Sequence, residues 1–199
     1  MQAKWRVGEI AFDERMPPLA AAAMDDVQRK AAEELTAGPR GGVKGPFVAL
    51  LRSPELMDRF QRVGEYLRFH SALDPRISEF AMLVVSRDWT QHFEWCTHVP
   101  LAQKAGLAQS VIDDVYEGRR PSGMKPDEHA AYALLDELAR TRGVSKTTYL
   151  AAVNVFGERG VVDLLGVAGY FTALSMLMNA VHTPPPSQTQ VPLLSPYPL

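Results

Sequence analysis

Residues Asp74 to Gly106 decide the fold, and they read DPRISEFAMLVVSRDWTQHFEWCTHVPLAQKAG. The stretch predicts two consecutive helices. Asp74 can cap the free backbone N–H groups of a helix start, and Pro75 is tolerated at the first helical position. An apolar run follows, and we expect the first helix to end near Asp88. We expect Thr90 to cap the second helix, and Gly106 stands where a helix-terminating glycine is common.

One face of the second predicted helix carries polar side chains suited to proton transfer. Gln91, Glu94 and His98 follow one another at spacings of three and four residues, which stack side chains on one helix face. A carboxylate beside an imidazole fixes its tautomer and raises its basicity, and such a pair can transfer protons near neutral pH. Because the connection between the two helices is short, we expect them to pack antiparallel and to bring Glu79 towards His98. The same pair is also common as a solvated or structural feature, so spacing alone leaves both interpretations open.

Other side chains in this stretch are open to two interpretations. Cys96 lies two residues from His98, about 200° around the helix, and we expect a small buried apolar residue rather than a nucleophile. Trp95 either packs in the core or lines a substrate pocket. Arg76 either binds a substrate carboxylate or is solvated at the surface. A metal site would need Glu94, His98 and a third ligand, and the His-Glu-x-x-His zinc pattern is missing, so we predict no metal.

The composition is typical of a soluble globular chain. With 199 residues, of which 46% are hydrophobic and 22% charged, we expect one domain that buries roughly 70% of its unfolded surface. Lys and Arg total 21 against 23 Asp and Glu, a formal charge of -2, which favours neither nucleic acid nor an anionic membrane as a partner. The single cysteine cannot form an intramolecular disulfide. No run of about 18 apolar residues occurs and the N-terminal sequence does not resemble a secretory signal, so we predict a cytoplasmic protein without a membrane span.

The rest of the chain also predicts helices, and no strand pattern is found, so we predict an all-α fold. The expected helices cover residues 19–36, 54–70, 109–117, 126–142, a segment capped by Ser145 and broken by Gly157 and Gly160, and 161–181. The loop of Gly and Pro residues from 38 to 46 is either a lid or a plain connection. We expect one helical domain over residues 1–182, with its core at about 54–182. The proline-rich tail, 183–199, should be extended, and it either covers a neighbouring subunit or is disordered.

The sequence resembles the carboxymuconolactone decarboxylase family, which includes the alkylhydroperoxidase D-like (AhpD-like) proteins. The resemblance lies in the segments RISEFAMLVVSRDW and QHFEWCTHVPLAQKAGL, at Arg76, Glu79, Glu94, Trp95, His98, Ala102, Gly106 and Leu107. The segments SPELM, EGRRP and GVVDLLGVAGYFTALSMLMNA resemble one branch of that family. The resemblance covers most of the chain. It implies a single-domain AhpD-like helical bundle that forms homo-oligomers, often trimers or hexamers, with the site near subunit contacts.

The two branches of the family differ in their cysteines. In the peroxidase branch a Glu is followed by a Cys-x-x-Cys pair and a His. Here Glu79 and His98 match the Glu and the His, but Gln91 and Glu94 stand where the two cysteines would be. A dithiol–disulfide cycle needs two thiols, so the sequence is closer to the decarboxylase branch. That resemblance implies that His98 donates a proton to carbon, that Glu94 orients it and that Glu79 is a supporting or acid/base carboxylate. Gln91 could hydrogen-bond a substrate carbonyl.

These patterns give one leading hypothesis and two alternatives. The leading hypothesis is a cofactor-independent lyase acting on a small carboxylated ring or lactone, with His98, Glu94 and Glu79 catalytic and with Gln91, Arg76 and Trp95 binding the substrate. The first alternative is a peroxide-handling antioxidant protein, which needs a reactive thiol. The second is a non-catalytic oligomeric binding protein on the same scaffold, in which the three catalytic candidates would line no cavity. We expect a small-molecule substrate and self-association, and neither nucleic acid nor membrane as a partner.

Overall fold

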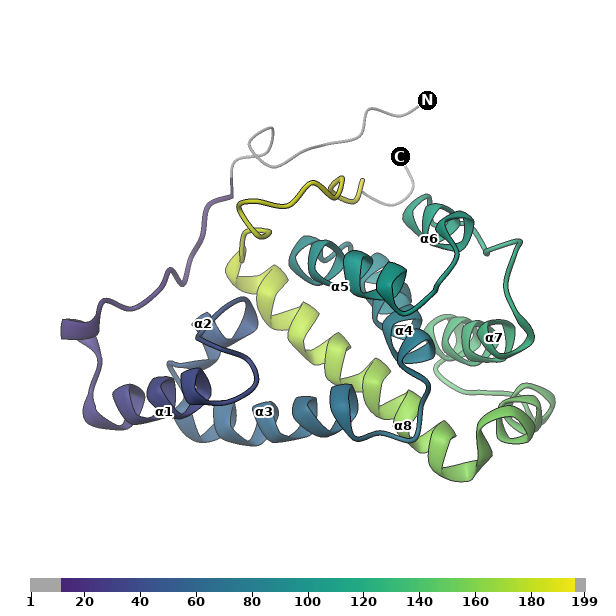
Figure 1. The fold of residues 1–199 in the computed structure, drawn as a ribbon, viewed down its shortest axis with the longest axis horizontal. Helices are drawn as coiled ribbons and strands as arrows, with labels where there is room; N and C mark the ends of the chain where they lie inside the picture. Colours follow the sequence, from purple (N-terminus) through teal and green to yellow (C-terminus); the bar gives the residue numbers. More distant parts are fainter. Residues whose placement is uncertain (1–11, 196–199) are drawn as a thin grey trace.

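The computed structural model describes residues 12–195, and its regular secondary structure there is entirely helical (Figure 1). This confirms the predicted all-α fold. A short 3-10 helix, η1, precedes eight α-helices, whose bounds are η1 Ala21–Ala23, α1 Asp26–Ala37, α2 Pro46–Leu50, α3 Pro54–Phe69, α4 Pro75–Asp88, α5 His92–Lys104, α6 Gln109–Tyr116, α7 Pro126–Thr141 and α8 Lys146–Val181.

Helices α4 and α8 form the centre of the fold. In Figure 1, α8 runs diagonally across the molecule, with α2 and α3 on one side of it and α4 and α5 on the other. Helix α4 packs against α5, α7 and α8. Phe80, Ala81, Met82 and Leu83 of α4 are all 0% exposed. Since four consecutive helical residues point in all directions around the axis, α4 is enclosed on every side, and its polar side chains can enter the interior.

Helix α8 is interrupted at Gly157, one of the two glycines predicted to break it. Gly157 has a φ of 67° and non-helical backbone, which glycine adopts without steric cost. The other, Gly160, lies within the second helical segment. By length and composition α8 could cross a membrane, with a mean hydropathy of 1.7, but half of its apolar window is buried inside the chain. A buried core helix has this same composition.

The start of the first helix differs from the sequence prediction. We predicted a helix over 19–36, but α1 begins at Asp26. Asp25 and Gln28 form a reciprocal capping box there, because the Asp25 side chain accepts from the Gln28 N–H and the Gln28 side chain accepts from the Asp25 N–H. The alanines before it favour helix by propensity alone. The cap satisfies N–H groups at a helix start, and it determines where α1 begins.

The proline-rich tail is largely extended, as predicted, and it lies on its own chain. Leu193 and Leu194 are 0% exposed. The Tyr116 hydroxyl on α6 donates to the Leu193 carbonyl at 3.0 Å, and Arg87 on α4 donates to the Ser195 carbonyl at 2.7 Å. The tail thus closes over the α4–α6 side of the bundle. Residues 196–199, which include other apolar residues of the predicted tail, lie outside the described part of the chain.

Candidate active site

Gln91 positions the start of α5, the helix that carries the site. We predicted Thr90 as the cap, and this was wrong, because Thr90 has a φ of 48° whereas Gln91 has the extended backbone that an N-cap requires. The Gln91 Oε1 accepts from the N–H groups of Phe93 and Glu94. Its Nε2 donates to Asn179 Oδ1 on α8 at 3.0 Å. Gln91 therefore fastens α5 to α8, and both its amide oxygen and its amide nitrogen form hydrogen bonds within the chain.

His98 lies between two carboxylates, one from each helix of the α4–α5 pair. Its Nδ1 is 2.7 Å from Glu79 Oε2 on α4, and its Nε2 is 3.2 Å from Glu94 Oε2 on its own helix. His98 is 2% exposed and Glu94 is 3% exposed. The ring edge of His98 meets the Phe171 ring of α8 with the centroids 5.1 Å apart. The structure thus brings together the three side chains predicted to be catalytic.

The two carboxylates keep His98 protonated at neutral pH. Burial by itself lowers the pKa of an imidazole, but the hydrogen bonds to Glu79 and Glu94 outweigh it and raise the pKa of His98 to about 8. Below that pH both ring nitrogens carry hydrogen and both donate, one to each carboxylate. The resting site therefore holds a buried proton donor, which suits general acid catalysis near pH 7.

A cavity of about 600 Å³ opens beside Glu94 and His98. Glu79 is not among its lining residues, so it supports the imidazole from the far side. Much of the wall is apolar and comes from five segments of the chain, with Pro46, Phe47, Phe69, Phe93, Phe171, Leu174 and Pro186 among its residues. A pocket of this size, apolar but with a few convergent polar groups, is typical of small-molecule sites.

The cavity also holds polar groups that sequence reasoning missed. Arg40 and Lys44 come from the 38–46 loop, Arg68 from α3 and Tyr170 from α8. Gly45 allows the loop to come this close, since it has a φ of 55° and an added Cβ would lie 2.3 Å from the Phe93 ring. The loop lines the site, in keeping with either of its predicted roles. In the sequence, Arg40 and Lys44 are two cationic residues in a glycine-rich loop. No local spacing relates this loop to His98, so sequence patterns alone did not place these residues at the site.

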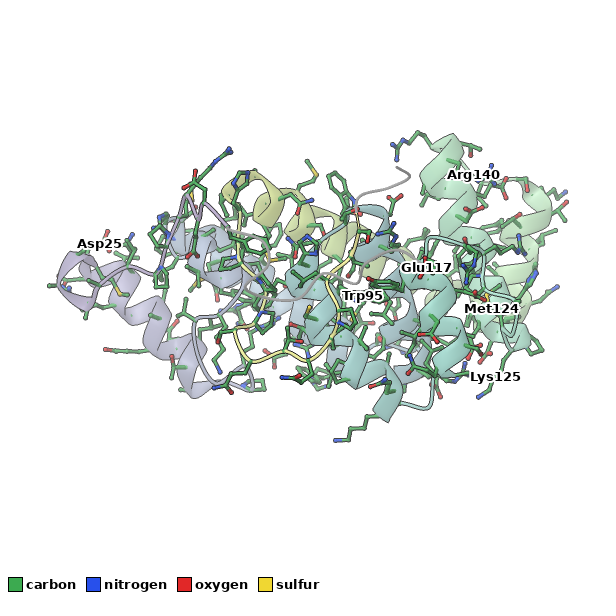
Figure 2. The ribbon with its side chains drawn as sticks, turned by 90° about the horizontal axis from the view of Figure 1, so that it is seen from above. Asp25, Trp95, Glu117, Met124, Lys125 and Arg140 are labelled. Carbon is green, nitrogen blue, oxygen red and sulfur yellow. The ribbon has the colours of Figure 1, made fainter. Side chains whose placement is uncertain are left out.

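None of the three predicted substrate-binding residues lines the cavity: Gln91 caps α5, and the other two lie elsewhere. Arg76 forms ion pairs with Asp127 and Glu128 at the start of α7, so it ties α4 to α7. Trp95 is 1% exposed and lies near the middle of the molecule (Figure 2), with its ring 5.8 Å from that of Tyr116. Neither residue lines the cavity, and both contribute to packing where they stand.

Cys96 lies on the other side of α5 from the imidazole cavity. It is 4% exposed, and its sulfur faces the Val191 carbonyl of the tail at 3.9 Å. Burial raises the pKa of its thiol to about 11, so little thiolate forms at neutral pH. Within residues 12–195, no group of three or more His, Cys, Asp or Glu is arranged to hold a metal ion.

Solved structures share this fold at low sequence identity. A peroxidase-related protein from Ralstonia eutropha with an alkylhydroperoxidase AhpD core superposes with a TM-score of 0.72 at 17% identity, over 89% of this chain and 97% of its own. A peroxidase-related protein from a Silicibacter species gives 0.72 at 14% identity, over 97% and 100%. A protein of unknown function from Agrobacterium tumefaciens, associated by name with the antioxidant defence protein AhpD, gives 0.63 at 16% identity, over 72% and 99%.

These likenesses show that the chain has the AhpD-like helical fold, as the sequence predicted. No protein-family model matches the sequence, and no curated protein matches it either. At identities of 14 to 17% the shared fold does not determine the chemistry, because one fold hosts many reactions. The function depends on the side chains at the site.

Proposed function

We propose that this protein is a carboxymuconolactone decarboxylase-like lyase that acts by proton transfer on a small carboxylated ring or lactone. One observation carries the proposal. A buried imidazole, held between Glu79 and Glu94 and protonated at neutral pH, faces a cavity large enough for such a molecule. The resemblance of the α4–α5 segment to the decarboxylase branch supports the choice of reaction.

The reaction requires one proton and a place for negative charge. When the bond to the carboxylate breaks, its electron pair stays on the substrate as an enolate-like carbanion and CO2 leaves. A general acid must then protonate a carbon of this delocalised carbanion. His98 lines the cavity and has a pKa of about 8, close enough to neutral pH for its N–H to be both present and transferable. The apolar wall keeps water away from the carbanion, which strengthens the electrostatic interactions inside the site.

The two carboxylates differ in position and therefore in proposed role. Glu79 lies outside the cavity lining and makes the shorter contact, 2.7 Å to Nδ1, so it orients the imidazole and retains the Nδ1 hydrogen. Glu94 lines the cavity and makes the longer contact, 3.2 Å to Nε2. The Nε2 hydrogen is thus the one delivered to substrate. We infer that orientation belongs mainly to Glu79, a role that the family resemblance implied for Glu94.

A peroxidase function has weaker physical support. Two structural neighbours are peroxidase-related by name and a third is associated with antioxidant defence. Thiol peroxidase chemistry needs an accessible thiolate. Cys96 is the chain's single cysteine, and it is buried with a raised pKa. Gln91 and Glu94, which occupy the positions of the two redox cysteines, carry no sulfur. Peroxide consumption by the purified protein remains the direct test of this alternative.

The proposal is tested by replacing His98. His98→Asn removes the proton donor, and we expect at least a hundredfold loss of CO2 release from carboxymuconolactone, a typical contribution of general acid catalysis. His129→Gln is the matched control, because His129 is an exposed histidine on α7 outside the cavity lining. In D2O the wild-type product should carry one deuterium at the ring carbon that takes the proton after CO2 is lost, as measured by mass spectrometry and NMR.

Two results would contradict the proposal. One is a folded His98→Asn variant that releases CO2 as fast as wild type. The other is a wild-type protein that releases none from carboxymuconolactone or from other small ring and lactone acids, while it consumes hydroperoxide. Circular dichroism and thermal melting establish that each variant is folded before activity is compared.

We also propose that the chain self-associates, as the resemblance implies. Several large apolar side chains are exposed on α3 and α8, among them Val63, Phe69, Val162 and Met176. Exposed apolar groups on adjoining helices are common at subunit contacts. Analytical ultracentrifugation would show whether the trimer or hexamer expected from the resemblance forms.

A further inference from the structure

The cavity beside His98 carries an excess of positive charge that proton transfer does not use. Its charged lining residues are Arg40, Lys44 and Arg68 against a single carboxylate, Glu94, with protonated His98 beside it. The whole chain has a formal charge of -2, so the excess is local. Lys44 is exposed to solvent, whereas the two arginines are partly buried. A cationic corner in a largely apolar cavity attracts an anion.

The two arginines retain hydrogen-bond donors without acceptors. Nε and Nη2 of Arg40 and Nε of Arg68 are buried atoms with no hydrogen-bond partner in the described structure. Neither guanidinium has an ion-pair partner within residues 12–195, in contrast to Arg76 of the same fold. A buried donor without an acceptor costs free energy. Both arginines line the cavity, so an anion bound there would supply acceptors that the described structure lacks.

Tyr170 adds a third donor at the same corner. Its hydroxyl and the Arg40 guanidinium lie side by side above Gly64, where an added Cβ would be 2.3 Å from Tyr170 Oη and 2.5 Å from Arg40 Nη2. The residue is 7% exposed, its hydroxyl interacts with the Arg40 guanidinium, and no described residue accepts the hydroxyl hydrogen. Burial raises the pKa of Tyr170 to about 12, so the hydroxyl stays protonated and can donate. Glycine at position 64 provides the space for both groups.

The guanidiniums are held in place by aromatic rings. The Arg40 guanidinium carbon lies 4.4 Å from the centroid of the Phe47 ring, and that of Arg68 lies 5.1 Å from the centroid of the Phe69 ring. Such contacts stabilise a partly desolvated cation without using its N–H groups. The ring contacts restrain both guanidiniums and leave their N–H groups free of the rings.

We propose that Arg40, Arg68 and the Tyr170 hydroxyl form a carboxylate-binding site that anchors a small aromatic or ring carboxylate in the cavity. Guanidinium edges match the two oxygens of a carboxylate, and the apolar rings that line the cavity suit an apolar ring beside it. The site deepens the proposed function, and its role in substrate binding rests on that function. The binding itself can be measured without turnover.

Benzoate is the probe, and benzamide is its neutral counterpart of nearly the same shape. In isothermal titration calorimetry with the full chain, we expect saturable binding of benzoate and at least tenfold weaker binding of benzamide. Arg40→Gln and Arg68→Gln should each weaken benzoate binding at least about tenfold, as loss of a charged hydrogen bond does. Arg62→Gln is the matched control, since Arg62 lies on α3 like Arg68 but pairs with Asp58 outside the cavity lining.

The results of these experiments distinguish failure of the carboxylate-binding site from failure of the proposed reaction. If benzoate binds His98→Asn normally while that variant and wild type release no CO2, the carboxylate site stands and the proposed reaction fails. If CO2 release depends on His98 but benzoate binding is unchanged in folded Arg40→Gln and Arg68→Gln, the carboxylate site is overturned. Equal binding of benzamide and benzoate also overturns it. Tyr170→Phe removes only the hydroxyl. If an arginine variant fails to fold, benzoate binding by Tyr170→Phe tests the site in its place, and we expect that binding to be weaker than in wild type.

Discussion

Replacing Glu79 with glutamine should lower the pKa of His98 and narrow the pH range in which the protein is most stable. The pKa of His98 is raised from 6.5 to about 8 by its two carboxylates. Glu79→Gln keeps an oxygen that can accept from the Nδ1 hydrogen, but it removes the charge at 2.7 Å. Because burial alone lowers the pKa of an imidazole, we expect the pKa of His98 in the variant to fall by at least one unit.

The same shift has a consequence for folding stability. His98 has a higher pKa in the folded protein than its ordinary value of 6.5, so protonation stabilises the fold. This stabilisation is fully present below pH 6.5 and is lost as the pH rises through about 8. The shift corresponds to about 2 kcal/mol, since each pKa unit is worth about 1.4 kcal/mol. In Glu79→Gln most of this pH-dependent contribution should be absent.

Two measurements test the prediction. NMR titration of the five histidine ring signals, with His98 assigned from His98→Asn, gives its pKa in wild type and variant. Urea unfolding at several values between pH 6 and pH 9 gives the free energy of unfolding of each protein. Glu117→Gln is the control, because Glu117 is an exposed carboxylate at the end of α6 (Figure 2). A wild-type pKa for His98 at or below 6.5, or equal pKa values in wild type and Glu79→Gln, would refute the reasoning.

Two further predictions concern α5. Gln91→Ala removes an N-cap and the link to Asn179, and it should lower the free energy of unfolding by about 1 to 2 kcal/mol in urea, whereas Thr90→Ala should change it little because Thr90 is not the cap. Cys96 should react with a disulfide reagent such as DTNB only as fast as the protein unfolds, since its thiol is 4% exposed with a pKa of about 11, and rapid labelling of native protein would show that the thiol is accessible.

Local patterns in the sequence predicted the helices well because the relevant interactions are local. The starts of α3 and α4 follow from Ser53-Pro54 and Asp74-Pro75, and Gly118 with a φ of 68° follows α6 closely. The failures had local causes too. Alanine-rich sequence before Asp25 suggested an earlier helix start than the capping box allows. Thr90 had a suitable side chain for a cap, but its positive φ excludes it from that role.

The candidate site was predictable only where its residues share one helix or two adjacent ones. Glu94 and His98 are on one helix face, and a short connection places Glu79 opposite them. Arg40 and Tyr170 are 130 positions apart, and no periodicity relates them. They meet because α3 and the 38–46 loop pack on α8, which depends on the tertiary structure. Arg76 is cationic and lies near the site in the sequence. In the fold, however, it forms ion pairs with Asp127 and Glu128 at the start of α7.

The charges of the buried and partly buried groups at the site balance when one substrate carboxylate lies beside them. Glu79 and Glu94 contribute two negative charges, while protonated His98, Arg40 and Arg68 contribute three positive charges, so these five groups carry one excess positive charge. Lys44 also lines the cavity, but it is exposed to solvent and is available to a second carboxylate such as that of carboxymuconolactone. If the first carboxylate leaves as CO2 and His98 gives up its proton, two carboxylates and two guanidiniums remain, and the balance is kept. Buried charge is costly unless it is paired, so these five groups favour one buried substrate carboxylate before the reaction and none after it. Reprotonation of His98 restores the attraction for the next anion.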